Sequence, residues 1–186
     1  MKLSVTGDIH GDVFLLFGMT ESMSDEETLF VAGDFGMFWY DTKICQEKML
    51  IINDILESKN SYIVFVDGNH DNHRFLNSQE VSNFYGAKSH KLMTRIIHIM
   101  RGEILRIDDI KIFCFGGAYS VDRFWRVKNE TYFEEELPNQ EEYDNGIMNL
   151  KRSNMKVDYI LTHTCPRSLV EKLGARHNVT EEEKLQ

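Results

Sequence analysis

Short apolar runs alternate with polar and amphipathic stretches along most of the chain. Runs rich in β-branched and aromatic residues predict buried strands at 3–6, 28–32, 62–66 and 159–162. Three further runs predict strands at 96–100, 103–107 and 111–115. The pairs Arg101-Gly102 and Asp108-Asp109 separate these later strands and suit hairpin turns. We therefore expect the later three strands to form a second sheet with antiparallel pairing.

Helices are predicted between the strands. The clearest spans 41–57, where apolar residues recur on one helical face and Asp41 is suited to cap the first turn. Further helical segments are predicted at 13–19, 73–76, 139–151, 166–173 and 178–186. The polar stretch around Gly86 predicts a loop. The aromatic run 35–40 has two interpretations, a loop packed on the core or one wall of a substrate cleft.

Polar side chains follow four of the predicted strands. The strand-end sequences are Gly7-Asp8-Ile9-His10, Gly33-Asp34, Gly68-Asn69-His70-Asp71 and His163. Ligands of α/β proteins bind at the carboxyl ends of strands, where loops direct side chains into a crevice. Asp8 and His10 are two residues apart, so in extended backbone they point to the same side. Each residue alone is more often a turn, cap or core residue, but four strand ends together indicate a metal site.

These ordered motifs resemble those of the calcineurin-like metallophosphoesterases over residues 3–166. The resemblance implies an α/β fold, the metallophosphoesterase-type four-layer sandwich, with two mixed β-sheets flanked by α-helices. It also implies two divalent metal ions, with manganese, iron or zinc suited to the mixed oxygen and imidazole ligands. Asp34 would be the bridging carboxylate. Asp8 and His10 would hold one ion, and Asn69 and His163 the other.

The same resemblance assigns roles to residues that contact the substrate. His70 would stabilise the phosphate or protonate the leaving group, and Asp71 would orient the His70 ring. Asn69 would lie beside the substrate as well as the metal. Arg123 and Arg126 are further candidates for substrate contact, because one guanidinium group can donate two parallel hydrogen bonds to the oxygens of a phosphate. The alternative for both arginines is an ordinary surface position.

We therefore expect hydrolysis of a phosphomonoester or phosphodiester by a hydroxide activated at two metal ions. The family pattern closes with a Gly-His-x-His motif that this chain lacks, so we expect residues 1–186 to form a single domain, incomplete at its C-terminus. That departure supports an alternative, a non-catalytic or weakly active metal- or nucleotide-binding protein of the same fold. The second motif continues as Phe35-Gly36-Met37 where phosphoprotein phosphatases carry Asp-Arg-Gly, which disfavours a phosphoprotein substrate.

The amino-acid composition restricts which binding partners and which cellular compartment we expect. The formal net charge of −9 over 186 residues disfavours a surface that coats nucleic acid. A phosphorylated small molecule or nucleotide stays compatible, because bound cations invert the potential of an acidic site. Three widely spaced cysteines indicate a reducing compartment. With no secretory signal and no apolar run near the ~18 residues of a membrane span, we expect a cytoplasmic protein without a membrane partner.

Overall fold

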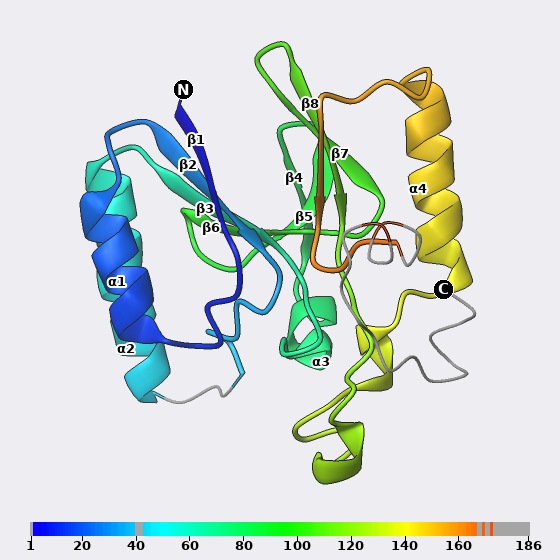
Figure 1. Cartoon of the computed structure of the whole chain (residues 1–186). Coiled ribbons are helices and arrows are strands. Elements are labelled where there is room, and N and C mark those ends of the chain that lie inside the picture. Colours follow the sequence, from blue (N-terminus) through cyan, green and yellow to red (C-terminus); the bar gives the residue numbers. More distant parts are fainter. Residues whose placement is uncertain (1, 40–42, 167–168, 170–171, 173–186) are drawn as a thin grey trace.

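Two mixed β-sheets pack face to face, with helices on the outer sides (Figure 1). The computed structural model describes residues 2–39, 43–166, 169 and 172. The six-stranded sheet has the order β1 (Lys2–Thr6), β2 (Glu27–Ala32), β3 (Tyr62–Val66), β6 (Ile96–Ile99), β5 (Ala87–Lys91) and β4 (Val81–Phe84). The three-stranded sheet has the order β7 (Glu103–Ile107), β8 (Ile110–Phe115) and β9 (Tyr159–Thr162). The prediction of two mixed sheets flanked by helices is confirmed.

The strand directions fix where the polar strand ends lie. β1, β2, β3 and β6 run parallel, so their carboxyl ends share one edge of the larger sheet. β5 and β4 complete that sheet with antiparallel pairing. In the smaller sheet β7 pairs antiparallel with β8, and β9 runs parallel to β8.

The helices occur where the apolar pattern predicted them. α1 (Val13–Ser22) and α2 (Lys43–Ser58) lie together on one side of the fold, and α4 (Gln140–Arg152) lies on the other (Figure 1). α3 (His73–Asn77) is a short helix after β3, and η1 (Arg123–Trp125) and η2 (Glu134–Glu136) are single 3₁₀ turns. Asp12 caps α1 by accepting from Phe14 N–H and Leu15 N–H, each at 3.0 Å. Within the described part of the chain, no helix is both long and apolar enough to cross a membrane.

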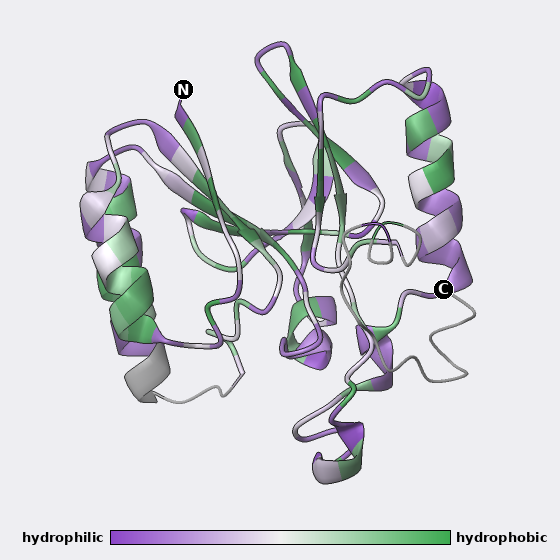
Figure 2. Ribbon diagram, viewed as in Figure 1, coloured by the Kyte–Doolittle hydropathy of each residue, from purple (hydrophilic) through white to green (hydrophobic). Residues whose placement is uncertain are grey.

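Alternate residues of the central strands build two apolar layers. In β2, Leu29 and Val31 pack with Leu16 of α1 and Ile52 of α2, whereas Phe30 packs between the two sheets. The layer between the sheets includes Val64, Ile97, Leu105, Ile112 and Leu161. Figure 2 shows this pattern as green strands in the middle of the fold. Each fully buried side chain of this kind contributes roughly 1.5–3 kcal/mol, so these layers hold the strand ends in fixed positions.

Two sequence predictions about the strands are wrong. The predicted loop around Gly86 is a hairpin of β4 and β5, turned by Tyr85 and Gly86 at φ of 47° and 83°. β4 alternates exposed and half-buried residues, and the buried positions of β5 are mostly polar, so neither strand carries a long apolar run. The run at 96–100 does not join the second sheet either. It forms β6 between β3 and β5, and Arg101-Gly102 crosses from one sheet to the other instead of forming a hairpin.

Other predictions agree with the structure or fall outside it. Asp108-Asp109 does turn between β7 and β8, with Asp108 at φ of 52°. The proposed Asp41 cap and the predicted helix at 178–186 lie outside the described residues, as does most of the predicted helix at 166–173.

Candidate metal centre

Four strand ends converge at one edge of the fold. Because β1, β2 and β3 run parallel, Asp8, Asp34 and Asn69 leave the larger sheet at neighbouring positions. His163 follows β9 of the other sheet and packs against Gly33, where an added Cβ atom would lie 2.3 Å from His163 Nδ1. The structure thus brings together all five predicted ligands, Asp8, His10, Asp34, Asn69 and His163.

Asp34 lies at the centre of this group and is only 2% exposed. Its Oδ2 lies 3.6 Å from His10 Nε2, and its Oδ1 lies 3.5 Å from His163 Nε2. The backbone N–H of His70 donates to Oδ1 at 2.7 Å. A Cβ atom on Gly68 would lie 2.1 Å from Oδ1, so only glycine lets the loop after β3 approach so closely. One carboxylate therefore faces two histidines through different oxygens.

Asp8 reaches the same two histidines from β1. Its Oδ2 lies 3.5 Å from His10 Nε2, and its Oδ1 lies 3.9 Å from His163 Nδ1. Two groups of three residues share Asp34, and within each group the ligand atoms all lie within 4.8 Å of one another. The first group is Asp8, Asp34 and His163, and the second is His10, Asp34 and His70. The second group includes His70, which the sequence assigned to catalysis and not to metal binding.

The polar atoms around His163 suit a bound cation. Its Nδ1 lies 2.8 Å from the carbonyl oxygen of Ala32, which only accepts, so Nδ1 carries the proton. Its Nε2 then faces Asn69 Oδ1 at 3.2 Å and Asp34 Oδ1 at 3.5 Å. A histidine fixed by a carbonyl through one nitrogen presents the other to a metal ion. Imidazole, carboxylate and amide oxygen are ligands that manganese, iron and zinc accept, so these residues fit a divalent ion.

The His70 imidazole lies beside the candidate ligands. It meets the His10 ring edge-on, with ring centres 4.9 Å apart and planes at 77°. Burial lowers the pKa of His70 below its ordinary value, because desolvation disfavours imidazolium more than Asp34 stabilises it. His70 also lines a neighbouring cavity together with His10. Its ring is therefore placed between the candidate ligands and the space beside them.

The predicted contact between Asp71 and the His70 ring is wrong. Asp71 is buried and accepts hydrogen bonds from three backbone N–H groups, those of Gly36 at 2.8 Å, Gly68 at 2.8 Å and Phe35 at 3.3 Å. Among the described residues, no hydrogen bond joins Asp71 to the His70 side chain. Burial raises the pKa of Asp71 to about 6, although the N–H donors oppose the shift. Asp71 instead ties the loop after β2 to the loop after β3.

The two predicted substrate arginines have different surroundings. Arg123 donates to the buried Glu136 carboxylate at 2.6 Å, and its guanidinium lies 4.2 Å from the Tyr119 ring centre. These contacts give Arg123 a role in the fold of this segment. Arg126 lines the cavity beside His70. Of the pair, Arg126 alone is among the described residues that line this cavity.

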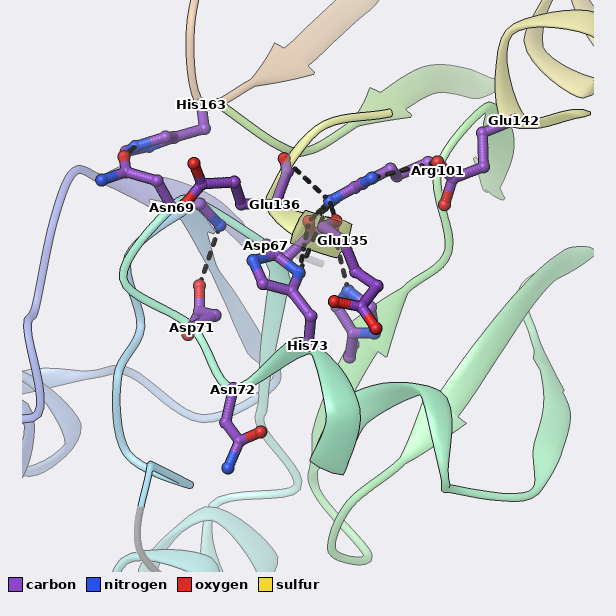
Figure 3. A network of polar contacts seen from close by, with 12 residues as sticks. Asp67, Asn69, Asp71, Asn72, His73, Arg101, Glu135, Glu136, Glu142 and His163 are labelled. Atoms are coloured by element: carbon purple, nitrogen blue, oxygen red, sulfur yellow. Dashed lines mark hydrogen bonds and ion pairs between the residues drawn. The ribbon is translucent and has the colours of Figure 1, made fainter. Parts of the chain in front are cut away.

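A buried ionic network lies behind the candidate ligands (Figure 3). Asp67, at the exit of β3, accepts from Arg101 Nε at 2.9 Å and Nη2 at 2.5 Å, and from His98 Nε2 at 3.2 Å. Arg101 Nη1 also donates to Glu142 of α4 at 3.0 Å. Burial alone would raise the pKa of Asp67, but Arg101 and His98 hold it well below its ordinary value. The sequence assigned Arg101 to a turn and gave no signal for this network.

Ser120 is a second residue to which the sequence assigned no role. Its Oγ donates to Glu136 at 2.7 Å and accepts from Asn69 Nδ2 at 3.2 Å and from Arg126 Nη1 at 2.5 Å. Because Ser120 holds the amide nitrogen of Asn69, the amide oxygen faces His163 (Figure 3). The sequence signal was the turn Gly116-Gly117-Ala118-Tyr119-Ser120 at the end of β8, which resembles a turn beside the metal site in the same family.

Comparison with known proteins agrees with the strand-end motifs. The family model described as calcineurin-like phosphoesterase matches residues 1–184. A search of curated proteins found no match. The family match spans every strand end described above, so it confirms the resemblance that those motifs carry.

Proposed function

The chain belongs to the calcineurin-like phosphoesterases, and on this premise we propose that it hydrolyses a phosphomonoester or phosphodiester with divalent metal ions held at the strand ends. The observation that carries the proposal is Asp34, whose two carboxylate oxygens face His10 and His163 separately. When bound, such ions neutralise phosphoryl oxygens and lower the pKa of water, which makes it a better nucleophile.

The ligand distances support a pair of ions around one shared carboxylate. One ion would be held by Asp8, His10 and Asp34, and the other by Asp34, Asn69 and His163. Asn69 contributes a neutral oxygen, so this ligand set leaves net positive charge for an anionic substrate.

His70 and Arg126 would act on the substrate itself. Both line the cavity beside the ligands. The Arg126 guanidinium is held by Ser120 and keeps a permanent positive charge that attracts phosphoryl oxygens. His70 would pass a proton to the leaving oxygen as the ester bond breaks, since its imidazole lies next to His10 and Asp34.

Hydrolysis of an aryl phosphate and an aryl phosphodiester with added Mn²⁺ tests the proposal. We expect Asp34→Asn to lose about 10²-fold or more in kcat/KM, because a bound ion is worth several kcal/mol to the transition state. Asp54→Asn is the matched control, since Asp54 is exposed on α2. Equal activity of the Asp34 variant and the control would refute the proposal. Bound metal without turnover of either ester would favour the alternative function, a metal-binding protein of this fold.

A second variant separates two roles for His70. If His70 passes protons, His70→Gln keeps the metal content and loses about 10²–10⁴-fold in rate. If His70 is a ligand, as its distances to His10 and Asp34 also permit, the same variant binds less metal. Metal content measured by elemental analysis distinguishes the two.

A further inference from the structure

A cavity of about 440 Å³ opens next to the candidate metal ligands. His10 and His70 line it, so it borders the place where a phosphate would lie. Its volume falls within the roughly 300–1,000 Å³ of pockets that enclose a whole small molecule. A phosphate group alone would leave most of this space unfilled, so the cavity has room for the organic part of an ester.

The cavity wall combines apolar side chains with positive charge. Met37, Trp39 and Met49 supply apolar surface, and both methionines are nearly fully buried. Lys48 and Arg126 supply two positive charges, and none of the lining residues that the structure describes is acidic. Arg126 Nη1 also lies 3.6 Å from the Asp122 carboxylate, which is outside the lining, so the wall offers one paired and one further cation to an anionic ligand with an apolar body.

Trp39 is held in place as part of this wall. Its indole packs against Phe133, with ring centres 5.8 Å apart, and the Arg126 guanidinium lies 5.8 Å from the indole centre. Ser120 anchors Arg126 through a hydrogen bond of 2.5 Å, so the arginine and the indole keep their relative positions. An indole beside a fixed guanidinium can stack on a planar ring while the cation contacts phosphate oxygens.

We propose that the preferred substrates are phosphate esters whose leaving group carries a planar aromatic ring, with Trp39 as the residue that recognises the ring. This inference rests on the proposed function and names the substrate class for the same site. In the reaction, water forms the new bond to phosphorus, the ester P–O bond breaks, and the leaving alcohol takes up a proton. A nucleoside phosphate and a simple aryl phosphate share this chemistry.

The test compares substrates that differ only in the ring. AMP and ribose 5-phosphate carry the same sugar and phosphoester, and we expect kcat/KM to be about 10-fold or more higher for AMP, the scale of one stacked base. Trp39→Leu should lower this ratio about 10-fold, and Trp39→Phe, which keeps an aromatic face, should restore most of it. Trp125→Leu is the control, because Trp125 is 92% exposed and does not line the cavity. Phenyl phosphate distinguishes a nucleoside phosphate from a simple aryl phosphate as the preferred substrate, since activity on phenyl phosphate equal to that on AMP indicates a simple aryl ester.

A ratio near one for the unchanged protein, or a ratio that Trp39→Leu does not move, would overturn the inference. If no ester is hydrolysed, the proposed function fails, and the inference is then decided by binding alone. Calorimetry with the non-hydrolysable methylenephosphonate analogue of AMP supplies that readout. Binding that Trp39→Leu weakens about 10-fold supports ring recognition, and absence of binding to the unchanged protein overturns it.

Discussion

Ser120→Ala is expected to weaken metal binding and to destabilise the fold through separate losses. The hydroxyl is fully buried and makes three hydrogen bonds, to Glu136, Asn69 and Arg126. Alanine leaves the buried Glu136 carboxylate and the Asn69 amide without this partner. Each unsatisfied buried group costs about 1–3 kcal/mol, so the free energy of unfolding should fall by roughly 2–4 kcal/mol.

The effect on metal binding follows from the orientation of Asn69. Without the Ser120 hydroxyl, nothing in the described structure holds the amide nitrogen away from His163. Partners of this kind change metal affinity by about 10–100-fold, and we expect a loss of that size for Mn²⁺. Calorimetric titration of the metal-free protein measures the affinity, and urea unfolding with a chelator measures the stability.

A matched control and a double variant make the test specific. Ser58→Ala removes an exposed hydroxyl that donates to Ile55 O at 2.7 Å, and it should change stability by less than about 0.5 kcal/mol. If Ser120 acts through Asn69, Ser120→Ala should change metal affinity little in an Asn69→Ala background. Fully additive losses of affinity in the double variant would refute the reasoning, even if stability falls as expected.

Three further changes probe other parts of the fold. Gly33→Ala should displace His163 and lower Mn²⁺ affinity about 10-fold or more in calorimetry, because the added Cβ would lie 2.3 Å from the ring in a backbone at φ of 89°. Arg101→Met should lower the free energy of unfolding, measured in urea, by about 3–5 kcal/mol, because Asp67 then stays buried without its cation. Adding Asp67→Asn should recover part of this loss, and no recovery would contradict this account. Burial would raise the pKa of Glu27, but Lys2 and other hydrogen-bond donors lower this pKa to about 2. The ionised Glu27 carboxylate therefore stabilises the fold above pH 4.5, and this stabilisation is lost as the pH falls to 2. Glu27→Gln should therefore lower the free energy of unfolding by roughly 1–2 kcal/mol at pH 7, a figure that allows for solvent screening of the exposed lysine. The difference in unfolding free energy between this variant and the unchanged protein should shrink toward pH 3. A difference that stays constant with pH would count against the ion pair.

Much of the fold and of the candidate site could be predicted from local sequence patterns. β2 carries a continuous apolar run that is buried on both faces, so the strand was recognisable from the sequence, whereas the face that each residue occupies was not. Asp8 and Asp34 follow such strands directly, and parallel strands place their ends together. The hairpin of β4 and β5 was not predicted, because neither strand has a continuous apolar run.

The sequence by itself determined which residue types stand at the strand ends and hence which ions they suit. Only the tertiary structure decided which of these groups touch, because a hydrogen bond between remote residues leaves no local pattern. Asp71 binds backbone N–H groups instead of the His70 ring, and Arg123 binds Glu136 instead of facing the cavity. Likewise, Ser120 controls an amide 51 positions away in the chain. Such pairings depend on how the loops after the strands pack together, and packing is a property of the whole fold.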